Sequence, residues 1–308
     1  MADSKIPRMI LSNHQSMSVM GLGTAAIEVP GVATKAAVIE AIKVGYRHFD
    51  TASAYGTEQP LGEAIEEALK LGLVVSRDEL FITSKLWFTD NHPDRVVPAL
   101  QKSLGLLKLE YLDLYLIHLP ISIKPESSNF FPSKDNIVPL DIEGVWAAME
   151  ECQKLGLTQS IGVSNFSVNK LESLLSVATI PPSVNQIQMN PSWQQKQLRE
   201  YCKEKGILIT AYSPLGAPGT RWGDNRILEN EVLIDIAKSH AKSVAQVTLR
   251  WLYEQGVSFV VKSHNKERMK DNIEIFDWSL TENDLEKISQ IKQTRANNEG
   301  NPLFDNLP

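Results

Sequence analysis

The feature that most constrains this chain is a regular alternation of short apolar runs with segments of helical periodicity. Eight runs of β-branched and aliphatic residues recur along its 308 residues, and a helical pattern follows nearly all of them. Such runs are apolar on both faces, which is typical of parallel strands covered by helices. The predicted strands are Val19–Gly23, Tyr46–Ala52, Phe81–Leu86, Leu112–His118, Ser160–Asn165, Val184–Met189, Leu208–Pro214 and Ser258–Ser263.

The intervening segments carry the spacing of amphipathic helices. In one of them, Leu61, Ile65, Ala68 and Leu69 fall at positions i, i+4, i+7 and i+8, which share one helix face. Gly72 then stands where a glycine commonly ends a helix. Strands therefore alternate with helices along most of the chain.

Eight β–α units close into a (β/α)8 barrel without leaving an unpaired sheet edge. We therefore predict an α/β protein with a TIM-barrel fold, in which residues 1–308 form a single domain. An open doubly wound sheet is the alternative, and its first turn should read G-x-G-x-x-G. The corresponding segment, Gly21–Ala26, lacks the third glycine.

The two ends of the predicted barrel differ. Before the first strand, Arg8–Leu11 and Ser16–Val19 are expected to form a hairpin that plugs the barrel bottom. Strand starts at residues 112 and 160, and at 208 and 258, are 48 and 50 residues apart, so these two connections are unusually long. Their loops, with Phe130, Phe131 and Trp222, should rim the carboxyl-terminal mouth, where barrel enzymes place their sites.

Composition narrows the possible partners and the compartment. Lys and Arg number 31 against 37 Asp and Glu, for a net charge of −6, so we expect no nucleic-acid or membrane partner. The two cysteines, Cys152 and Cys202, lie in predicted helices, and they suit the reducing cytoplasm. No secretory leader and no run of 18 apolar residues is present. The six histidines contain no His-x-His pair, so no metal is expected.

Four ionisable groups stand at or near the carboxyl ends of three neighbouring predicted strands. Asp50 ends the second strand, Tyr55 follows it, Lys85 is near the end of the third and His118 ends the fourth. Singly, each has a structural explanation, such as a turn cap, rim packing, an ion pair or a core histidine. Together they point at one face of the barrel, which makes them candidate catalytic residues.

These four groups would suit the protonation of a carbonyl oxygen. We expect Lys85 to stay protonated beside Asp50 and to lower the pKa of Tyr55 from about 10 toward working pH, which makes the phenol a general acid. A neutral His118 would orient the carbonyl oxygen. No side chain donates hydride, so a nicotinamide cofactor is required.

A basic cluster on this acidic protein supplies a candidate cofactor site. It spans Lys262–Lys270, at the end of the eighth strand and the start of the next helix, which suits a phosphate. Lys262 and Arg268 are expected to hold a 2′-phosphate, and Asn272 to reach the adenine. Other strand ends offer Ser164 and Asn165 for a carboxamide, Tyr212 for stacking on the nicotinamide, and the backbone from Ser213 to Gly216 for a pyrophosphate.

Two motifs strengthen this interpretation. The segment Gly45–Ala52, with Glu58 and the pair Leu61-Gly62 at the expected distances, resembles the first signature of the aldo-keto reductases, and Ile161–Phe166 resembles their second. The resemblance covers nearly the whole chain and is greatest to plant reductases of specialised metabolism. It implies a catalytic tetrad at Asp50, Tyr55, Lys85 and His118, and NADPH bound across the barrel mouth. The implied cofactor contacts are Gly23, Thr24, Ser164, Asn165, Gln186, Tyr212, Ser213, Leu215, Gly216, Lys262, Ser263, Asn265, Arg268 and Asn272.

Departures from the family pattern bear on the substrate. Ala25 and Leu119 stand where many members have tryptophans, while Trp87 and Trp222 remain as aromatic walls. We expect a wide apolar pocket for a bulky alkaloid or polyketide ketone, in a monomeric enzyme. A sugar-aldehyde or uronate reductase of the same mechanism, and a non-catalytic NADPH-sensing subunit, are the alternatives.

Overall fold

Eight parallel strands close into a barrel in the computed structural model, which describes residues 6–25, 31–124, 134–220 and 223–295. Around the barrel the strand order is β10-β11-β12-β3-β4-β5-β6-β9, and every neighbouring pair is parallel. The strands are β3 (Met20–Gly23), β4 (His48–Asp50), β5 (Phe81–Leu86), β6 (Leu112–Ile117), β9 (Thr158–Ser164), β10 (Val184–Gln188), β11 (Leu208–Tyr212) and β12 (Ser258–Val261). Each overlaps one predicted run, so the predicted (β/α)8 fold is confirmed.

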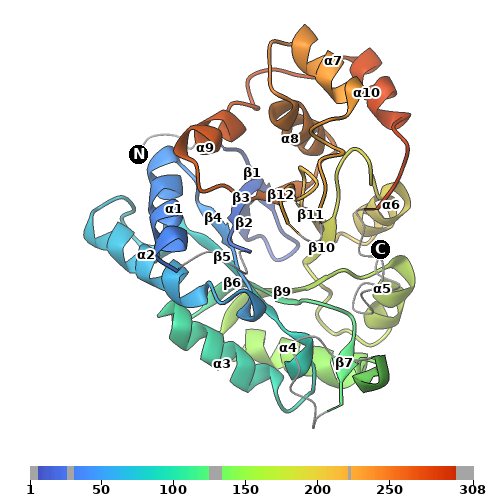
Figure 1. Ribbon diagram of the computed structural model, residues 1–308. Coiled ribbons are helices and arrows are strands. Elements are labelled where there is room, and N and C mark those ends of the chain that lie inside the picture. Colours follow the sequence, from blue (N-terminus) through green and yellow to red (C-terminus); the bar gives the residue numbers. More distant parts are fainter. Residues whose placement is uncertain (1–5, 26–30, 125–133, 221–222, 296–308) are drawn as a thin grey trace.

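Helices surround the barrel and cover the outward faces of the strands (Figure 1). They are α1 (Gly31–Val44), α2 (Glu58–Lys70), α3 (Val96–Leu107), α4 (Ile142–Lys154), α5 (Val168–Leu175), α6 (Lys196–Glu204), α7 (Glu231–Ser239), α8 (Val244–Glu254), α9 (Lys266–Ile273) and α10 (Glu282–Ser289). The predicted face of α2 is buried: Leu61, Ile65 and Ala68 are at most 2% exposed. None of the described helices combines the length and the apolar character needed to cross a bilayer.

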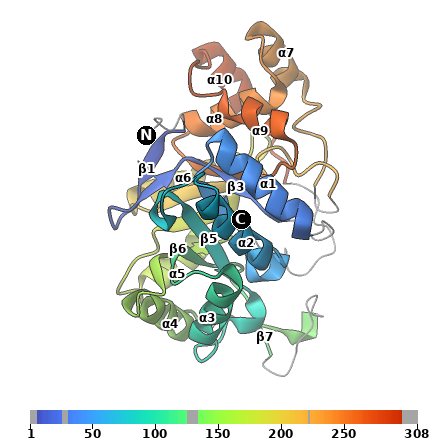
Figure 2. The same cartoon turned by 90° about the vertical axis from the view of Figure 1, so that its left-hand side faces the viewer.

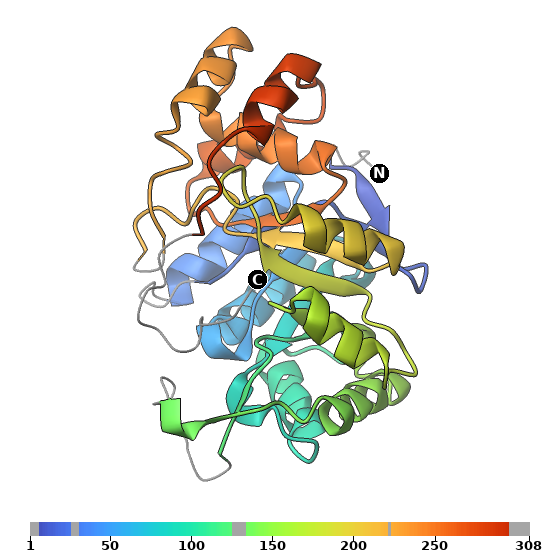
Figure 3. The same ribbon diagram turned by 90° about the vertical axis from the view of Figure 1, so that its right-hand side faces the viewer.

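The predicted hairpin closes the amino-terminal end of the barrel. Its strands β1 (Arg8–Ile10) and β2 (Ser16–Ser18) pair antiparallel, and Figure 3 shows them in dark blue at one end of the barrel. The turn between them binds two barrel strands near their amino ends, because Asn13 Nδ2 donates to Ser160 Oγ of β9 at 2.8 Å and Gln15 Nε2 to Asp113 Oδ1 of β6 at 3.1 Å. The bottom of the barrel is thus closed, which leaves the carboxyl-terminal end for a site.

The long connection after β6 contains a small two-stranded sheet, β7 (Ser122–Ile123) with β8 (Ile137–Val138), and a single helical turn, η4 (Lys134–Asn136). Figure 2 shows β7 at the periphery of the molecule. The predicted rim aromatics Phe130, Phe131 and Trp222 lie outside the described residues.

A glycine allows helices α2 and α3 to approach closely. A Cβ on Gly62 would lie 2.6 Å from the carbonyl carbon of Leu107 and 2.8 Å from its Cα, whereas a Cβ on Gly105 of α3 would meet no atom within 4 Å. A methyl group at residue 62 therefore forces the two helix backbones apart.

We expect Gly62→Ala to lower the free energy of unfolding by about 1–3 kcal/mol through overpacking. Gly105→Ala, the matched control, should raise it by about 0.5–1 kcal/mol, because alanine restricts the unfolded chain in a helix with room for the methyl. Urea unfolding followed by circular dichroism measures both. Equal effects of the two substitutions would contradict the close approach.

Candidate functional site

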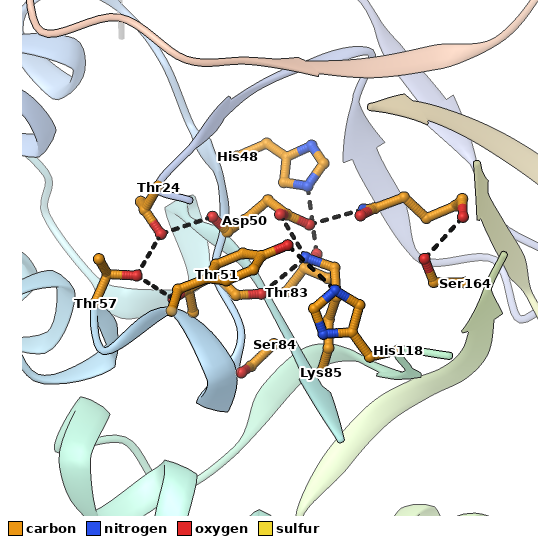
Figure 4. A network of polar contacts seen from close by, with 12 residues as sticks. Thr24, His48, Asp50, Thr51, Thr57, Thr83, Ser84, Lys85, His118 and Ser164 are labelled. Carbon is orange, nitrogen blue, oxygen red and sulfur yellow. Dashed lines mark hydrogen bonds and ion pairs between the residues drawn. The ribbon is translucent and has the colours of Figure 1, made fainter. Parts of the chain in front are cut away.

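The four candidate catalytic side chains meet at the carboxyl-terminal mouth of the barrel. Asp50 is the last residue of β4, Lys85 lies in β5, His118 directly follows β6, and Tyr55 ends the short helical turn η1 (Ser53–Tyr55). Lys85 Nζ donates to Asp50 Oδ1 at 2.5 Å and lies 5.1 Å from the centre of the Tyr55 ring (Figure 4). The Tyr55 hydroxyl lies 3.3 Å from His118 Nε2. The structure thus brings together four groups that are far apart in the sequence.

Burial controls the protonation of Tyr55. Desolvation raises the pKa of Tyr55 well above its usual value, and the charge of Asp50 acts in the same direction. The expectation that Lys85 would lower this pKa toward working pH is wrong, because burial and the negative charge of Asp50, which pairs with Lys85, raise it instead. Tyr55 therefore keeps its proton through the neutral range.

Lys85 is fully buried, and its pKa is lowered by desolvation, while Asp50 opposes that shift. A second acceptor, the carbonyl oxygen of Thr51 at 2.9 Å, also binds Nζ. A charged lysine in this position depends on both acceptors, since an isolated buried ammonium is costly.

His118 is neutral in this site, as the sequence predicts. Burial lowers the pKa of its imidazole well below the usual value, and Lys85 adds to the shift. Its Nδ1 is buried without a hydrogen-bond partner among the described residues, so Nε2, which faces Tyr55, is the nitrogen available to a ligand. The ring of Trp87 packs edge-on against the imidazole, with centroids 4.9 Å apart.

Hydroxyl groups hold the segment that carries Tyr55. Thr57 Oγ1 lies 2.8 Å from Thr24 Oγ1 and 2.9 Å from Thr51 Oγ1, and Thr24 Oγ1 donates to the carbonyl of Asp50 at 3.0 Å (Figure 4). Ser53 Oγ donates to the carbonyl of Lys85 at 3.0 Å. Sequence analysis missed these tethers. Thr24, expected at the cofactor, instead turns its hydroxyl into this network.

A further tether joins α2 to β5. Ser84 Oγ donates to the buried carboxylate of Glu58 at 2.6 Å, and burial raises the pKa of that carboxyl. Glu58 follows the Tyr55 segment directly, so this contact fixes its far end. The only sequence signal was the place of Glu58 in the first signature motif.

The expected nicotinamide contacts lie at the same mouth, at the carboxyl ends of β9, which neighbours β6, and of β11. Asn165 Nδ2 donates to the carbonyl of His118 at 3.0 Å, and the Tyr212 hydroxyl donates to Asn165 Oδ1 at 2.8 Å. Ser164 Oγ donates to the carbonyl of Gln186 at 2.8 Å. Amide and hydroxyl groups are therefore gathered beside the tetrad, although each is already bound to the protein.

Two cations of the basic cluster form ion pairs with carboxylates of the protein, and two others are exposed. Lys266 pairs with Glu40 on α1 at 2.9 Å, and Lys270 pairs with Glu267 at 3.1 Å. Lys262 and Arg268, the two predicted phosphate ligands, are exposed at the start of α9. Partial burial lowers the pKa of Lys262. Two cations beside a helix amino terminus fit a phosphate dianion.

Other expected cofactor residues take several positions. Asn265 caps α9, where its Oδ1 accepts from the backbone N–H of Arg268 at 2.9 Å, and Ser263 Oγ accepts from the N–H of Asn265. Asn272 is only 5% exposed, and its side chain hydrogen-bonds with the Tyr46 hydroxyl, so its contact with an adenine stays a prediction. Gly23 ends β3, and the loop after β11 contains Ser213, Leu215 and Gly216, of which Ser213 and Gly216 have positive φ.

Of the four residues expected to contact the substrate, two lie at the mouth of the barrel and one is buried away from it. Trp87 is half-buried beside His118, and Ala25 ends the first described segment, where it is also half-buried. Leu119 is 2% exposed and packs with Phe88 and Ile123, so it does not form an exposed wall. Trp222 lies outside the described residues.

The other end of the barrel has a separate cavity of about 310 Å³, lined by residues that include Arg8, Gln15, Tyr111 and Asp113. It touches none of the tetrad and belongs to the hairpin plug. Within the described ranges, no group of three or more His, Cys, Asp or Glu side chains is placed to hold a metal ion.

Below the Asp50–Lys85 pair lies a buried histidine. His48, two residues before Asp50 on β4, is 1% exposed and contacts Thr83 Oγ1 and the carbonyl of Ser18, each at 3.3 Å. Burial lowers the pKa of His48 to about 4.

Acid should therefore destabilise the fold through His48. Unfolded histidine takes up a proton near pH 6.5, whereas folded His48 does so only near pH 4, so the free energy of unfolding falls across that window as the pH drops. The shift corresponds to about 3 kcal/mol. Urea titrations at pH 6.5 and 4 should show a smaller fall for His48→Gln than for the wild type, and the full fall for His14→Gln in the exposed hairpin turn. The same fall in all three would refute the assignment.

The comparisons with known proteins agree with this geometry. The model of the aldo/keto reductase family matches residues 19–293. The (1S)-1,7-diacetoxy-luvungin A aldo-keto reductase of Citrus sinensis is 60% identical over 96% of this chain and 93% of its own length. The NADPH-dependent codeinone reductase 1-4 of Papaver somniferum is 58% identical, with 96% and 92% covered, and the D-galacturonate reductase of Fragaria ananassa is 54% identical, with 95% and 93% covered.

Proposed function

This chain belongs to the aldo/keto reductase family, and we propose that it reduces the ketone of a bulky, largely apolar plant metabolite to an alcohol, with NADPH as the reductant. It is an NADP-dependent oxidoreductase of the carbonyl-reducing kind. The observation that carries the proposal is the place of the Tyr55 hydroxyl, 3.3 Å from Nε2 of His118 and beside the buried Lys85–Asp50 pair.

Each side chain of the tetrad has its own role in the protonation of the carbonyl oxygen. Tyr55 donates its hydroxyl proton to the carbonyl oxygen, and His118 Nε2 binds the same oxygen and orients it. Lys85, held by Asp50, lies 5.1 Å from the Tyr55 ring and stabilises the charge left on the phenol oxygen. When bound, the reduced nicotinamide supplies a hydride to the carbonyl carbon.

We assign the cofactor contacts by chemistry. Lys262 and Arg268 would bind the 2′-phosphate, since both are exposed cations at the amino end of α9. Ser164 and Asn165 would bind the carboxamide, and the ring of Tyr212 would stack on the nicotinamide. The backbone near Ser213, Leu215 and Gly216 would lie along the pyrophosphate, with Gly23 and Ser263 nearby.

The substrate class rests on the relatives and on the mouth. The citrus relative is named for (1S)-1,7-diacetoxy-luvungin A, and the poppy relative is named for codeinone. The small Ala25 and the aromatic Trp87 fit an apolar ketone of that size. The strawberry relative, named for D-galacturonate, favours a sugar-acid aldehyde as the second candidate. We further propose that residues 1–308 act as one domain, as a monomer in the cytoplasm.

Tyr55→Phe should lower kcat by at least about 100-fold and leave the Kd for NADPH within about twofold, because it removes the proton and keeps the ring. Steady-state kinetics and fluorescence titration measure the two values. Retained turnover would show that another group is the acid. In the wild type, a bulky ketone should oxidise bound NADPH in a single turnover, whereas an NADPH-sensing subunit would not do so.

Lys262→Ala and Arg268→Ala should each weaken NADPH by about 10- to 100-fold and leave NADH almost unchanged, because only NADPH carries the 2′-phosphate. Lys270→Ala, which removes a cation already paired with Glu267, is the control and should change neither affinity by more than about twofold. Equal losses for both cofactors in the first two variants would remove the phosphate assignment.

Among ketones and aldehydes offered with NADPH, polycyclic ketones should give a kcat/KM at least about 10-fold above that of D-galacturonate, since the site selects by apolar contact. A panel of morphinan, tropane, polyketide and uronic acid carbonyls measures this. A higher kcat/KM for galacturonate would establish the second candidate.

A further inference from the structure

Gln186 reaches across the barrel to the tetrad. It lies on β10, which stands four strands from β4 in the closed ring of eight, on the opposite wall. Its side chain is 3% exposed, and its Nε2 donates to Asp50 Oδ2 at 2.7 Å. The sequence placed Gln186 among the cofactor contacts, yet the structure binds its amide to the carboxylate.

The two oxygens of Asp50 have different donors. Lys85 occupies Oδ1 at 2.5 Å, and Gln186 occupies Oδ2 at 2.7 Å. Asp50 is 3% exposed, so loss of either donor would leave a buried carboxylate oxygen without its hydrogen bond. The pair of donors holds the carboxylate in one orientation.

The backbone of Gln186 is itself fixed. Its carbonyl accepts from Ser164 Oγ at 2.8 Å and from the backbone N–H of Asn165 at 2.9 Å. These bonds hold the backbone of Gln186 to β9, and its side chain spans from there to Asp50.

We propose that Gln186 is a positioning residue of the reductase, whose amide orients the Asp50 carboxylate so that Asp50 can hold Lys85 beside Tyr55. This proposal rests on the proposed function. It assigns Gln186 a part in the protonation step, acting through Asp50, rather than only a part in holding the cofactor.

The proposal predicts that turnover and cofactor binding respond differently. Without the Gln186 amide, Oδ2 of the buried Asp50 loses its donor, and the carboxylate is no longer held in one orientation toward Lys85. Turnover should therefore fall while the affinity for NADPH is kept.

The test compares two variants. Gln186→Leu removes the amide donor and keeps a side chain of similar size, whereas Gln101→Leu makes the same substitution on the exposed face of α3. For Gln186→Leu we expect kcat at saturating NADPH to fall about 10-fold or more. The Kd for NADPH, from quenching of protein fluorescence, should change less than about threefold. Gln101→Leu should match the wild type.

A second variant keeps the test decisive if Gln186→Leu does not fold. In Gln186→Glu the added carboxyl can donate to Asp50 only while it is protonated, so kcat should fall as the pH rises through the range where the wild type is constant. An unmoved kcat profile in the folded variants would overturn the proposal. So would a Kd for NADPH weakened more than about 10-fold with that profile unmoved, since Gln186 would then act on the cofactor alone.

The cofactor-free protein separates this proposal from the proposed function. The free energy of unfolding in urea should be lower for Gln186→Leu than for the wild type, because Oδ2 of the buried Asp50 loses its donor. This holds even if no tested carbonyl is reduced. Equal free energies of unfolding in the two proteins would contradict the proposal, whereas an inactive wild type would contradict only the reductase assignment.

Discussion

The buried ion pair between Lys85 and Asp50 is the interaction on which the site depends. Removing two charges from water costs several kcal/mol per ion, and that cost is offset only by close geometry and additional hydrogen bonds. Both are present: Nζ and Oδ1 are 2.5 Å apart, the Thr51 carbonyl accepts from Nζ, and the Gln186 amide donates to Oδ2. The barrel tolerates the pair because strands on opposite walls supply these partners, and the pair in turn places a cation beside the Tyr55 ring.

The barrel interior changes character along its axis. At the closed end, Leu114 and Leu116 of β6 pack with Phe81, Val184 and the hairpin residue Met17. A polar layer follows, in which His48 contacts Thr83, and above it lies the tetrad at the mouth. Water is thus excluded from below, while ligands can enter from above. Burial within the barrel also explains why the pKa values of Tyr55 and His118 move away from their usual ranges.

Part of this organisation could be predicted from the sequence. The eight strands and the convergence of Asp50, Lys85 and His118 follow from local patterns, because the carboxyl ends of neighbouring parallel strands meet at one edge. Features that depend on distances across the barrel could not be predicted. The partner of Gln186 lies on the opposite wall, and the direction of the Tyr55 pKa shift depends on burial and on Asp50. The burial of Asn272 depends on how α9 packs, which its position one turn after Arg268 does not determine.

The most direct test of the account is a crystal structure of the protein with NADP⁺ and a bulky alcohol product. The account predicts that the alcohol oxygen lies within hydrogen-bond distance of both the Tyr55 hydroxyl and His118 Nε2, and that the carbon bearing it faces C4 of the nicotinamide. A nicotinamide ring outside the barrel mouth, or an alcohol oxygen bound by other side chains with the Tyr55 hydroxyl remote from it, would contradict the account.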